Sequence, residues 1–227
     1  MGLPAPRHNM WVSIVLLGDL LMIRSLFSGA LVGILSASAL VAQAQQAGNE
    51  TSFRFNGEAF TITRAAQVNV NKLVAFARPS LSCEGSCLSP MSAAEGVTTI
   101  GELDVMSFMT EQVAAGSGLI LDARMPEQRA VGFIPASVSV PVPTMAADNP
   151  YRVDILRALG AKTAAGVSNF SGAVELVIFD AGPGTTDAQR LISTLLDSGY
   201  PAEKVKYYRG GMQVWTALGL TTQETPS

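Results

Sequence analysis

The stretch Val174–Leu196, VELVIFDAGPGTTDAQRLISTLL, decides the fold. It predicts a buried strand, a Gly-Pro-Gly loop and then a helix. The start of a helix after such a loop presents unpaired backbone N–H groups and the positive end of the helix dipole, and both favour anions. The first residue of the loop is Asp180, and a carboxylate is a poor nucleophile. What this loop can do therefore depends on Asp180.

Short apolar runs alternate with helical patterns around this stretch. Strand patterns cover 119–124, 137–143, 175–179 and 204–210, and helical patterns cover 102–115, 151–161, 186–198 and 212–219. This alternation predicts an α/β fold in which a parallel sheet is covered by helices on both faces. Such sheets bind ligands beyond the carboxyl ends of their strands, where Asp122 and Asp180 both fall.

Two longer segments resemble the rhodanese-like family. LILDARMPEQRAVGFIPASVSVPVP has its Asp-x-Arg, Pro-Glu helix start and Gly-x-Ile-Pro pattern, with Ser137 in place of the family's alanine. VIFDAGPGTTDAQRLISTLLDSGYPAEKVKYYRGGMQVWTALGL has the order of strand, active loop, helix, Gly-Tyr, strand, Gly-Gly, Trp and Gly-Leu. The resemblance implies a rhodanese-like domain over residues 97–222, followed by a tail at 223–227.

The resemblance also says what the loop lacks. Rhodanese-like enzymes carry a cysteine after this strand, and its thiolate takes a sulfur atom from a donor such as thiosulfate. The matching position here is Asp180, and the loop has no basic residue to attract an anionic donor. Some exported relatives have a Cys-x-Gly-Pro-x-Cys loop, in which Asp180 and Thr185 would occupy both cysteine positions. Because a carboxylate cannot carry a persulfide, the resemblance implies a loop without thiosulfate sulfurtransferase activity and without a cofactor.

The hypothesis for the loop is that the Asp180 carboxylate accepts the N–H groups that a thiolate or bound anion would otherwise receive. The candidate ligand loop consists of Asp180, Ala181, Gly182, Pro183, Gly184, Thr185 and Thr186. Asp122 and Arg124 could form a functional pair at the mouth of the site, but the favoured interpretation is a structural network that ties loops together.

The N-terminal region predicts export. The net charge of −3 and pI near 5.2 give no basic surface for nucleic acid. Residues 1–44 resemble a secretory signal ending in Ala-Gln-Ala, with Met22 as an alternative start, and the expected location is the bacterial periplasm. An uncleaved anchor over 10–42 is the alternative, and it would be the only membrane contact. Cleavage would remove His8, the only histidine, which excludes histidine-based catalysis and His-ligated metal.

Residues 45–96 are predicted to form a hairpin and a cysteine-bearing connector. Alternation around Asn56-Gly57 over Thr51–Thr63 predicts a two-stranded hairpin that packs on the main domain or on a second subunit. The composition of 65–92 suggests a connector or a lid. Within it, Cys83 and Cys87 are expected to form a small disulfide. The alternative is a dithiol that relays sulfur or electrons; two thiols without histidine make no good zinc or haem site.

The sequence thus leaves two classes of function. The first is an exported binding or accessory module in sulfur or redox metabolism, which binds an unidentified protein partner or a small anion at the Asp180 loop and the connector. The second is a sulfurtransferase or thiol redox carrier that uses Cys83 and Cys87.

Overall fold

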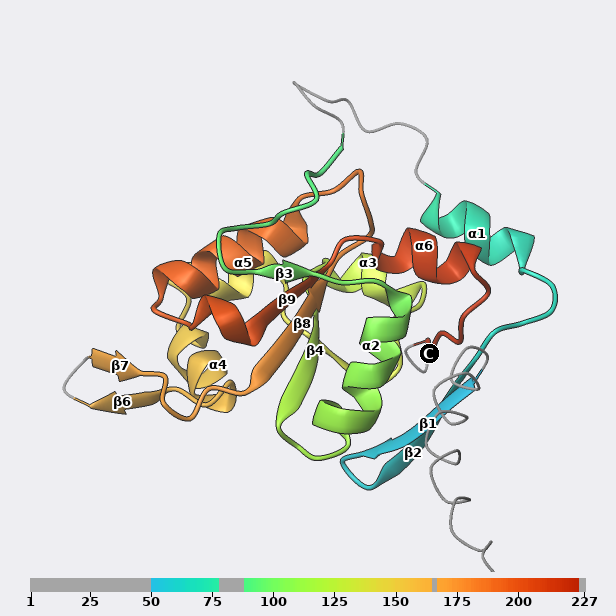
Figure 1. Ribbon diagram of the computed structural model, residues 1–227. Coiled ribbons are helices and arrows are strands. Elements are labelled where there is room, and N and C mark those ends of the chain that lie inside the picture. The colour runs from blue at the N-terminus through green and yellow to red at the C-terminus, as the bar shows by residue number, and fades with distance from the viewer. Residues whose placement is uncertain (1–49, 78–87, 165–166, 225–227) are drawn as a thin grey trace, which may run out of the picture. The chain divides into compact units, whose positions relative to one another are not determined.

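The computed structural model describes residues 50–77, 88–164 and 167–224 (Figure 1). The expected signal segment at 1–44 and both Cys83 and Cys87 lie outside the described residues. Within the described part of the chain, no helix has the length and apolar character needed to cross a bilayer.

Five parallel strands form the central sheet, in the order β3-β9-β8-β4-β5. These strands are β3 (Thr98–Thr99), β4 (Gly118–Asp122), β5 (Ser137–Ser139), β8 (Glu175–Phe179) and β9 (Val205–Tyr208). The parallel sheet expected from the sequence is confirmed, with the short edge strand β3 as an addition. In the β4–β8 pairing, Asp122 lies opposite Phe179, so Asp122 and Asp180 both lie at the carboxyl ends of the strands.

Helices cover both faces of the sheet, as predicted. The core on one face includes α4 (Arg152–Ala158) and α5 (Asp187–Asp197), and the core on the other includes α2 (Glu102–Phe108), the π-helical turn η1 (Met109–Val113) and α6 (Gly211–Ala217) (Figure 1). Strand β8 feeds both cores, because Leu176 and Ile178 pack in the first while Val177 and Phe179 pack in the second. The remaining short helices are α3 (Pro126–Ala130), η2 (Val142–Met145) and η3 (Ala202–Lys204).

The predicted hairpin is confirmed as β1 (Glu50–Phe55) and β2 (Glu58–Thr63). Its turn places Asn56 at φ 50° and Gly57 at φ 83°, the left-handed pair that a two-residue hairpin turn needs. Phe53 and Phe60 stack at 5.3 Å between ring centroids and are buried with the α2 and α6 core. The hairpin therefore packs on the main domain of its own chain, which is one of the two surfaces expected for it.

The connector contains a helix that the sequence pattern did not predict, α1 (Val70–Phe76). The Asn69 side chain caps it by accepting the backbone N–H groups of Asn71 and Lys72. Helix α1 packs along α6 (Figure 1), and the Gln213 side chain donates to the Phe76 carbonyl at 3.2 Å. A second small hairpin, β6 (Lys162–Ala164) with β7 (Val167–Asn169), was also not predicted.

Candidate functional site

The Asp180 carboxylate lies inside its own loop. Strand β8 ends at Phe179, and the Asp180 side chain that follows is 0% exposed. One oxygen, Oδ1, accepts the Gly182 backbone N–H at 2.9 Å, and the other, Oδ2, accepts the Ala188 backbone N–H at 3.0 Å. Each carboxylate oxygen therefore accepts one backbone N–H group, Oδ1 from the loop and Oδ2 from the first turn of α5.

This arrangement replaces an ordinary helix cap. Helix α5 begins at Asp187, and its N-cap residue Thr186 makes no side-chain capping bond. The N–H that such a cap would accept, that of Ala188, goes to Asp180 instead. The Asp180 side chain thus does from the end of the strand what a cap normally does from the residue next to the helix.

Burial controls the protonation of this carboxyl group. It raises the pKa of Asp180 from 3.8 to about 6, even though the N–H groups of Ala188 and Gly182 and the Thr185 hydroxyl pull the pKa down. The negative charge of Asp187 adds a smaller upward shift. Among the described residues, no lysine or arginine forms an ion pair with Asp180.

The Gly210-Gly211 turn holds the loop in place. The backbone N–H groups of Met212 and Gln213 donate to the carbonyls of Asp180 and Ala181, at 3.1 and 3.0 Å. Gly211 has φ +55°, and a Cβ there would lie 2.5 Å from the Asp180 carbonyl oxygen. This position therefore requires glycine.

Ser89, in the connector, covers one side of the loop. Its backbone N–H donates to the Pro183 carbonyl at 2.7 Å, and its hydroxyl donates to the Thr185 carbonyl. The Arg209 side chain fixes Ser89 in turn, with Nε donating to the Ser89 carbonyl at 2.8 Å. Ser89 is 4% exposed, so this segment lies directly on the loop.

Phe76, at the end of α1, lies beside the loop, since it lines the same small cavity as Ala181. Its ring lies 5.9 Å from the Arg124 guanidinium, and it would be 3.2 Å from a Cβ at Gly132. Beside Ala181 there remains a cavity of about 20 Å³, lined by Phe76, Arg124 and their neighbours. That volume has room for about one water molecule and is too small for a thiosulfate ion.

Asp122 and Arg124 form an ion-pair network at the end of β4, and the structural role favoured for it from the sequence stays a prediction. Both are buried, and Asp122 accepts Arg124 Nε at 2.8 Å and Nη2 at 2.6 Å. Arg124 also donates to the Gln128 and Gly132 carbonyls, so it fixes the segment that follows β4. None of these contacts reaches the Asp180 side chain.

Arg129 is the third member of this network, and the sequence analysis missed it. Its Nη1 donates to Asp122 Oδ2 and to the Ser137 hydroxyl, both at 2.9 Å, and its Nη2 donates to the Ser137 carbonyl. The available signal was Ser137 itself, because a hydroxyl where the family has alanine needs a polar partner when it is buried.

Several large side chains of the domain belong to its hydrophobic core. Tyr207, Tyr208 and Trp215 are fully buried, as are Met109 and, nearly, Met106. Among the described residues, no group of three or more His, Cys, Asp or Glu side chains is placed to hold a metal ion.

The family comparison supports the same fold. Residues 107–218 match the model of the rhodanese-like domain family. This part of the chain is a rhodanese-like domain, and the resemblance seen in the sequence is confirmed. A search of curated proteins gave no match.

Solved structures show similarity to part of the chain. A Rhodopseudomonas palustris protein of unknown function, described as a possible tyrosine phosphatase, is 20% identical, with 58% of this chain and 88% of that chain covered and a TM-score of 0.42. A rhodanese-like domain protein from Staphylococcus aureus is 20% identical over 57% of this chain and 100% of that chain, with a TM-score of 0.39. Thiosulfate sulfurtransferase from Pseudomonas aeruginosa is 22% identical over 58% of this chain but only 21% of its own length, with a TM-score of 0.39.

Proposed function

We propose that this protein is an exported, catalytically silent rhodanese-like module that binds a partner in sulfur or redox metabolism. The observation that carries the proposal is the position of Asp180, whose two carboxylate oxygens accept the Gly182 and Ala188 N–H groups. A sulfur-transfer loop needs a thiolate at this position and free N–H groups around it. With Asp180 at this position the thiolate is absent, and two of the N–H groups are already bonded to the carboxylate.

The covering of the loop supports the same proposal. Ser89 bonds to the outer carbonyls of the loop, and Phe76 leaves a cavity of about 20 Å³ beside Ala181. A sulfur donor and an acceptor would both have to reach the residue at position 180, which is fully buried. Residues of this chain therefore occupy the space that a sulfur donor or acceptor would need.

The outer surface of the covering segments is where a protein partner would bind. Val74 on α1 and Met91 after Ser89 are each 65% exposed. Exposed apolar side chains on two segments that lie over one site favour a protein surface as the ligand. A small anion is the other candidate partner, and it would require the Asp180 carboxylate to leave the loop N–H groups.

The alternative function uses the cysteines. Cys83 and Cys87 lie outside the described residues, and Ser89, two residues after Cys87 in the sequence, is bonded to the loop. That connection favours sulfur or electron relay by the two thiols as the second candidate. In it, the fold would supply the binding surface while the connector supplied the chemistry.

A thiosulfate-to-cyanide assay separates the two functions. We expect no thiocyanate from the wild-type protein and none from the Cys83→Ser/Cys87→Ser variant. Asp180→Cys combined with Phe76→Ala should gain activity, since it restores the thiol and enlarges the cavity beside Ala181. Asp180→Cys alone should gain less, and circular dichroism checks that each variant is folded. Wild-type activity that disappears in the double serine variant would establish the relay function instead.

A further inference from the structure

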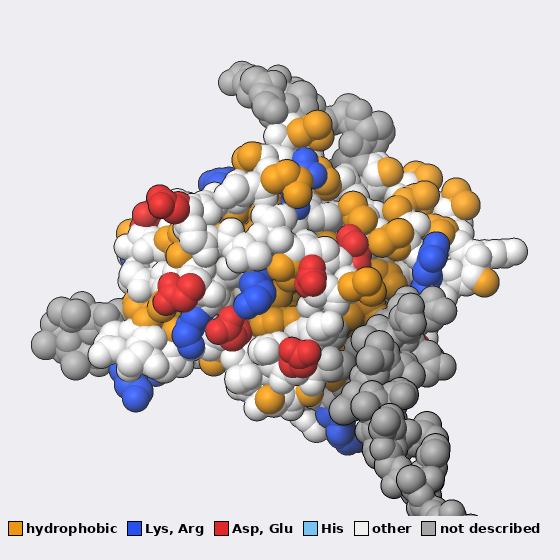
Figure 2. All heavy atoms as spheres, in the orientation of Figure 1, with side chains coloured by type: hydrophobic (Ala, Val, Ile, Leu, Met, Phe, Trp, Pro, Cys, Tyr) orange, Lys and Arg blue, Asp and Glu red, His pale blue; other side chains and the backbone are white. Residues whose placement is uncertain are grey.

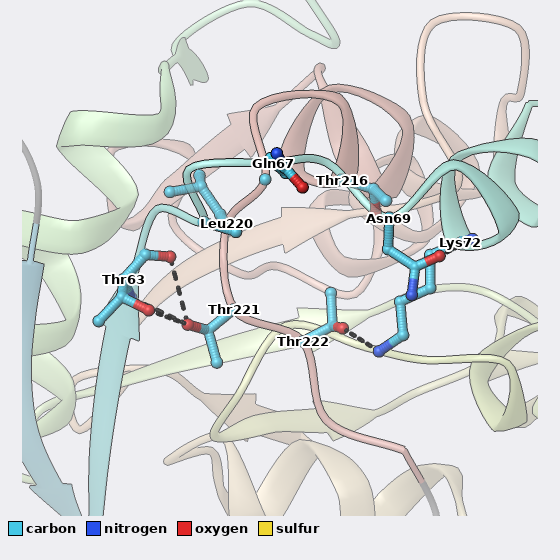
Figure 3. Close-up of a pocket in the computed structure, with 10 residues that line it drawn as sticks. Thr63, Gln67, Asn69, Lys72, Thr216, Leu220, Thr221 and Thr222 are labelled. Carbon is cyan, nitrogen blue, oxygen red and sulfur yellow. Dashed lines mark hydrogen bonds between the residues drawn. The ribbon is translucent and has the colours of Figure 1, made fainter.

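A polar pocket lies away from the Asp180 loop, between the connector and the chain that follows α6 (Figure 3). Its volume is about 290 Å³, close to the lower end of the range for small-molecule sites. The connector supplies Gln67, Asn69 and Lys72, and the C-terminal side supplies Thr216 and the strand-like segment Leu220–Thr222. We propose that this pocket binds a small carboxylate-bearing molecule.

Thr216 is the first reason. Its side chain lines the pocket and is 5% exposed, yet its hydroxyl oxygen has no hydrogen-bond partner. A buried hydroxyl without a partner costs stability, and native proteins avoid it except where a ligand or water supplies the partner. This hydroxyl is closed to solvent in the structure, and a rotation about the Thr216 Cα–Cβ bond would present it to a ligand group in the adjoining pocket.

Lys72 is the second reason. It is the only charged side chain among the residues that line the pocket. Its ammonium donates to the Thr222 hydroxyl at 2.9 Å and contacts a carboxylate oxygen of Glu224, also at 2.9 Å (Figure 3 shows the first contact). Glu224 is 58% exposed, so this pair is held weakly and a ligand carboxylate can take the same place.

The other polar groups complete a donor-rich surface. The side-chain amide oxygen of Asn69, Oδ1, accepts two backbone N–H groups of α1, which leaves the side-chain NH₂ group available as a donor. The Thr63 and Thr221 hydroxyls bond to each other at 3.2 Å on the opposite wall (Figure 3). One cation, an amide donor and several hydroxyls match a carboxylate that also carries hydroxyl groups.

The site also connects to the cover of the Asp180 loop. Lys72 and Phe76 lie one turn apart on α1, and the ligand would contact both α1 and the C-terminal segment. Binding would therefore hold α1 in the position in which Phe76 lies beside the loop. This inference does not depend on whether the loop is catalytically silent.

Calorimetry with matched probes tests the proposal. Lactate and gluconate are the charged probes, and lactamide and glucose are their uncharged counterparts. We expect binding of at least one charged probe, at least about tenfold tighter than its uncharged counterpart. Lys72→Met should weaken that binding about tenfold, Lys72→Arg should retain most of it, and Thr216→Val should weaken it about fivefold.

The controls distinguish a site from a general charge effect. Arg54→Met removes an exposed cation whose guanidinium bonds the Gly57 carbonyl in the hairpin turn, and it should leave binding unchanged. Melting curves without ligand show that each variant is folded. The proposal is overturned if neither charged probe binds at millimolar concentration, if glucose binds as well as gluconate, or if Lys72→Met and Arg54→Met have equal effects.

Discussion

Two neighbouring strands each place an aspartate at the carboxyl-terminal end of the sheet, and the two carboxylates are bound by different kinds of group. Asp122, at the end of β4, is bound by the guanidinium groups of Arg124 and Arg129. Asp180, after β8, is bound by two backbone N–H groups and by no cation among the described residues. The first arrangement is an ion-pair network, and the second is a loop whose backbone N–H groups are bonded to the chain's own carboxylate.

The difference lies in the groups that compensate each buried carboxylate. An ion pair in the interior neutralises itself, so the Asp122 network needs nothing from outside. The Asp180 loop has N–H groups that suit an anion, and it satisfies them with a buried carboxylate that has no counter-ion in the part of the chain that the structure describes. The raised pKa of Asp180, about 6, is the consequence of that burial.

The largest expected effect comes from breaking the ion-pair network. Asp122→Ala leaves Arg124 buried without its partner, and we expect a loss of about 3 to 5 kcal/mol in the free energy of unfolding. Urea unfolding measures it. The control is Asp154→Ala, which breaks the exposed pair with Arg157 and should cost about 0.5 kcal/mol or less. Equal costs for the two variants would show that the Asp122 network is not structural.

Removing the Asp180 carboxylate should have the next largest effect. Asp180→Ala leaves the Gly182 and Ala188 N–H groups without acceptors, at about 1 to 3 kcal/mol each, while relief of the buried charge offsets part of this. We expect a net loss of about 2 to 3 kcal/mol at neutral pH, or a new affinity for anions such as sulfate. Asp187→Ala, on the same helix turn, is the control. An unchanged melting temperature together with no anion binding would count against the account.

The pH dependence of the Asp180→Ala effect tests how the buried Asp180 carboxyl differs from the ion-paired Asp122. Because the folded pKa of Asp180 is raised from 3.8 to about 6, its protonation adds stability that is fully present below pH 3.8 and is lost as the pH rises through about 6. The stability difference between wild type and Asp180→Ala should therefore be about 2 kcal/mol larger near pH 4.5 than near pH 7.5. Urea unfolding of both proteins at the two pH values measures this, and a difference that grows toward pH 7.5 has the wrong sign.

The smallest expected effect tests the edge of the Asp122 network. Ser137→Ala restores the family residue and removes one acceptor of Arg129, which still keeps Asp122 and the Ser137 carbonyl. We expect a loss of about 1 kcal/mol. Ser52→Ala, which removes an exposed hydroxyl pair in the hairpin, should cost less. A stabilising Ser137→Ala would mean that the hydroxyl has no useful bond to Arg129.

The sequence predicted what depends on local pattern. The strands around β4 and β8, the helix after the Asp180 loop and the Asn56-Gly57 hairpin all carry strong periodicity or turn residues, and the structure contains each of them. Helix α1 has only seven residues in an Ala-rich connector, and it is held by Asn69 and by packing on α6, which no local pattern reveals.

The site was predictable only in part. The position of Asp180 followed from the order of the family motifs, but its two N–H contacts and its burial depend on the three-dimensional loop. The composition of 65–92 suggested a connector or a lid, but it did not identify Phe76 and Ser89, which lie about 90 or more positions earlier in the chain than the loop. Arg129 was missed for a different reason: its partners Asp122 and Ser137 are near in the sequence, but the fold and not a helical or strand repeat brings them to it.

One measurement tests the central claim most directly: the intact mass of the protein after incubation with thiosulfate, with and without later reduction. The account predicts an unchanged mass for the wild type and a gain of one sulfur atom for Asp180→Cys combined with Phe76→Ala. A wild-type protein that gains sulfur, and loses it on reduction, would contradict the account and place the chemistry on Cys83 and Cys87.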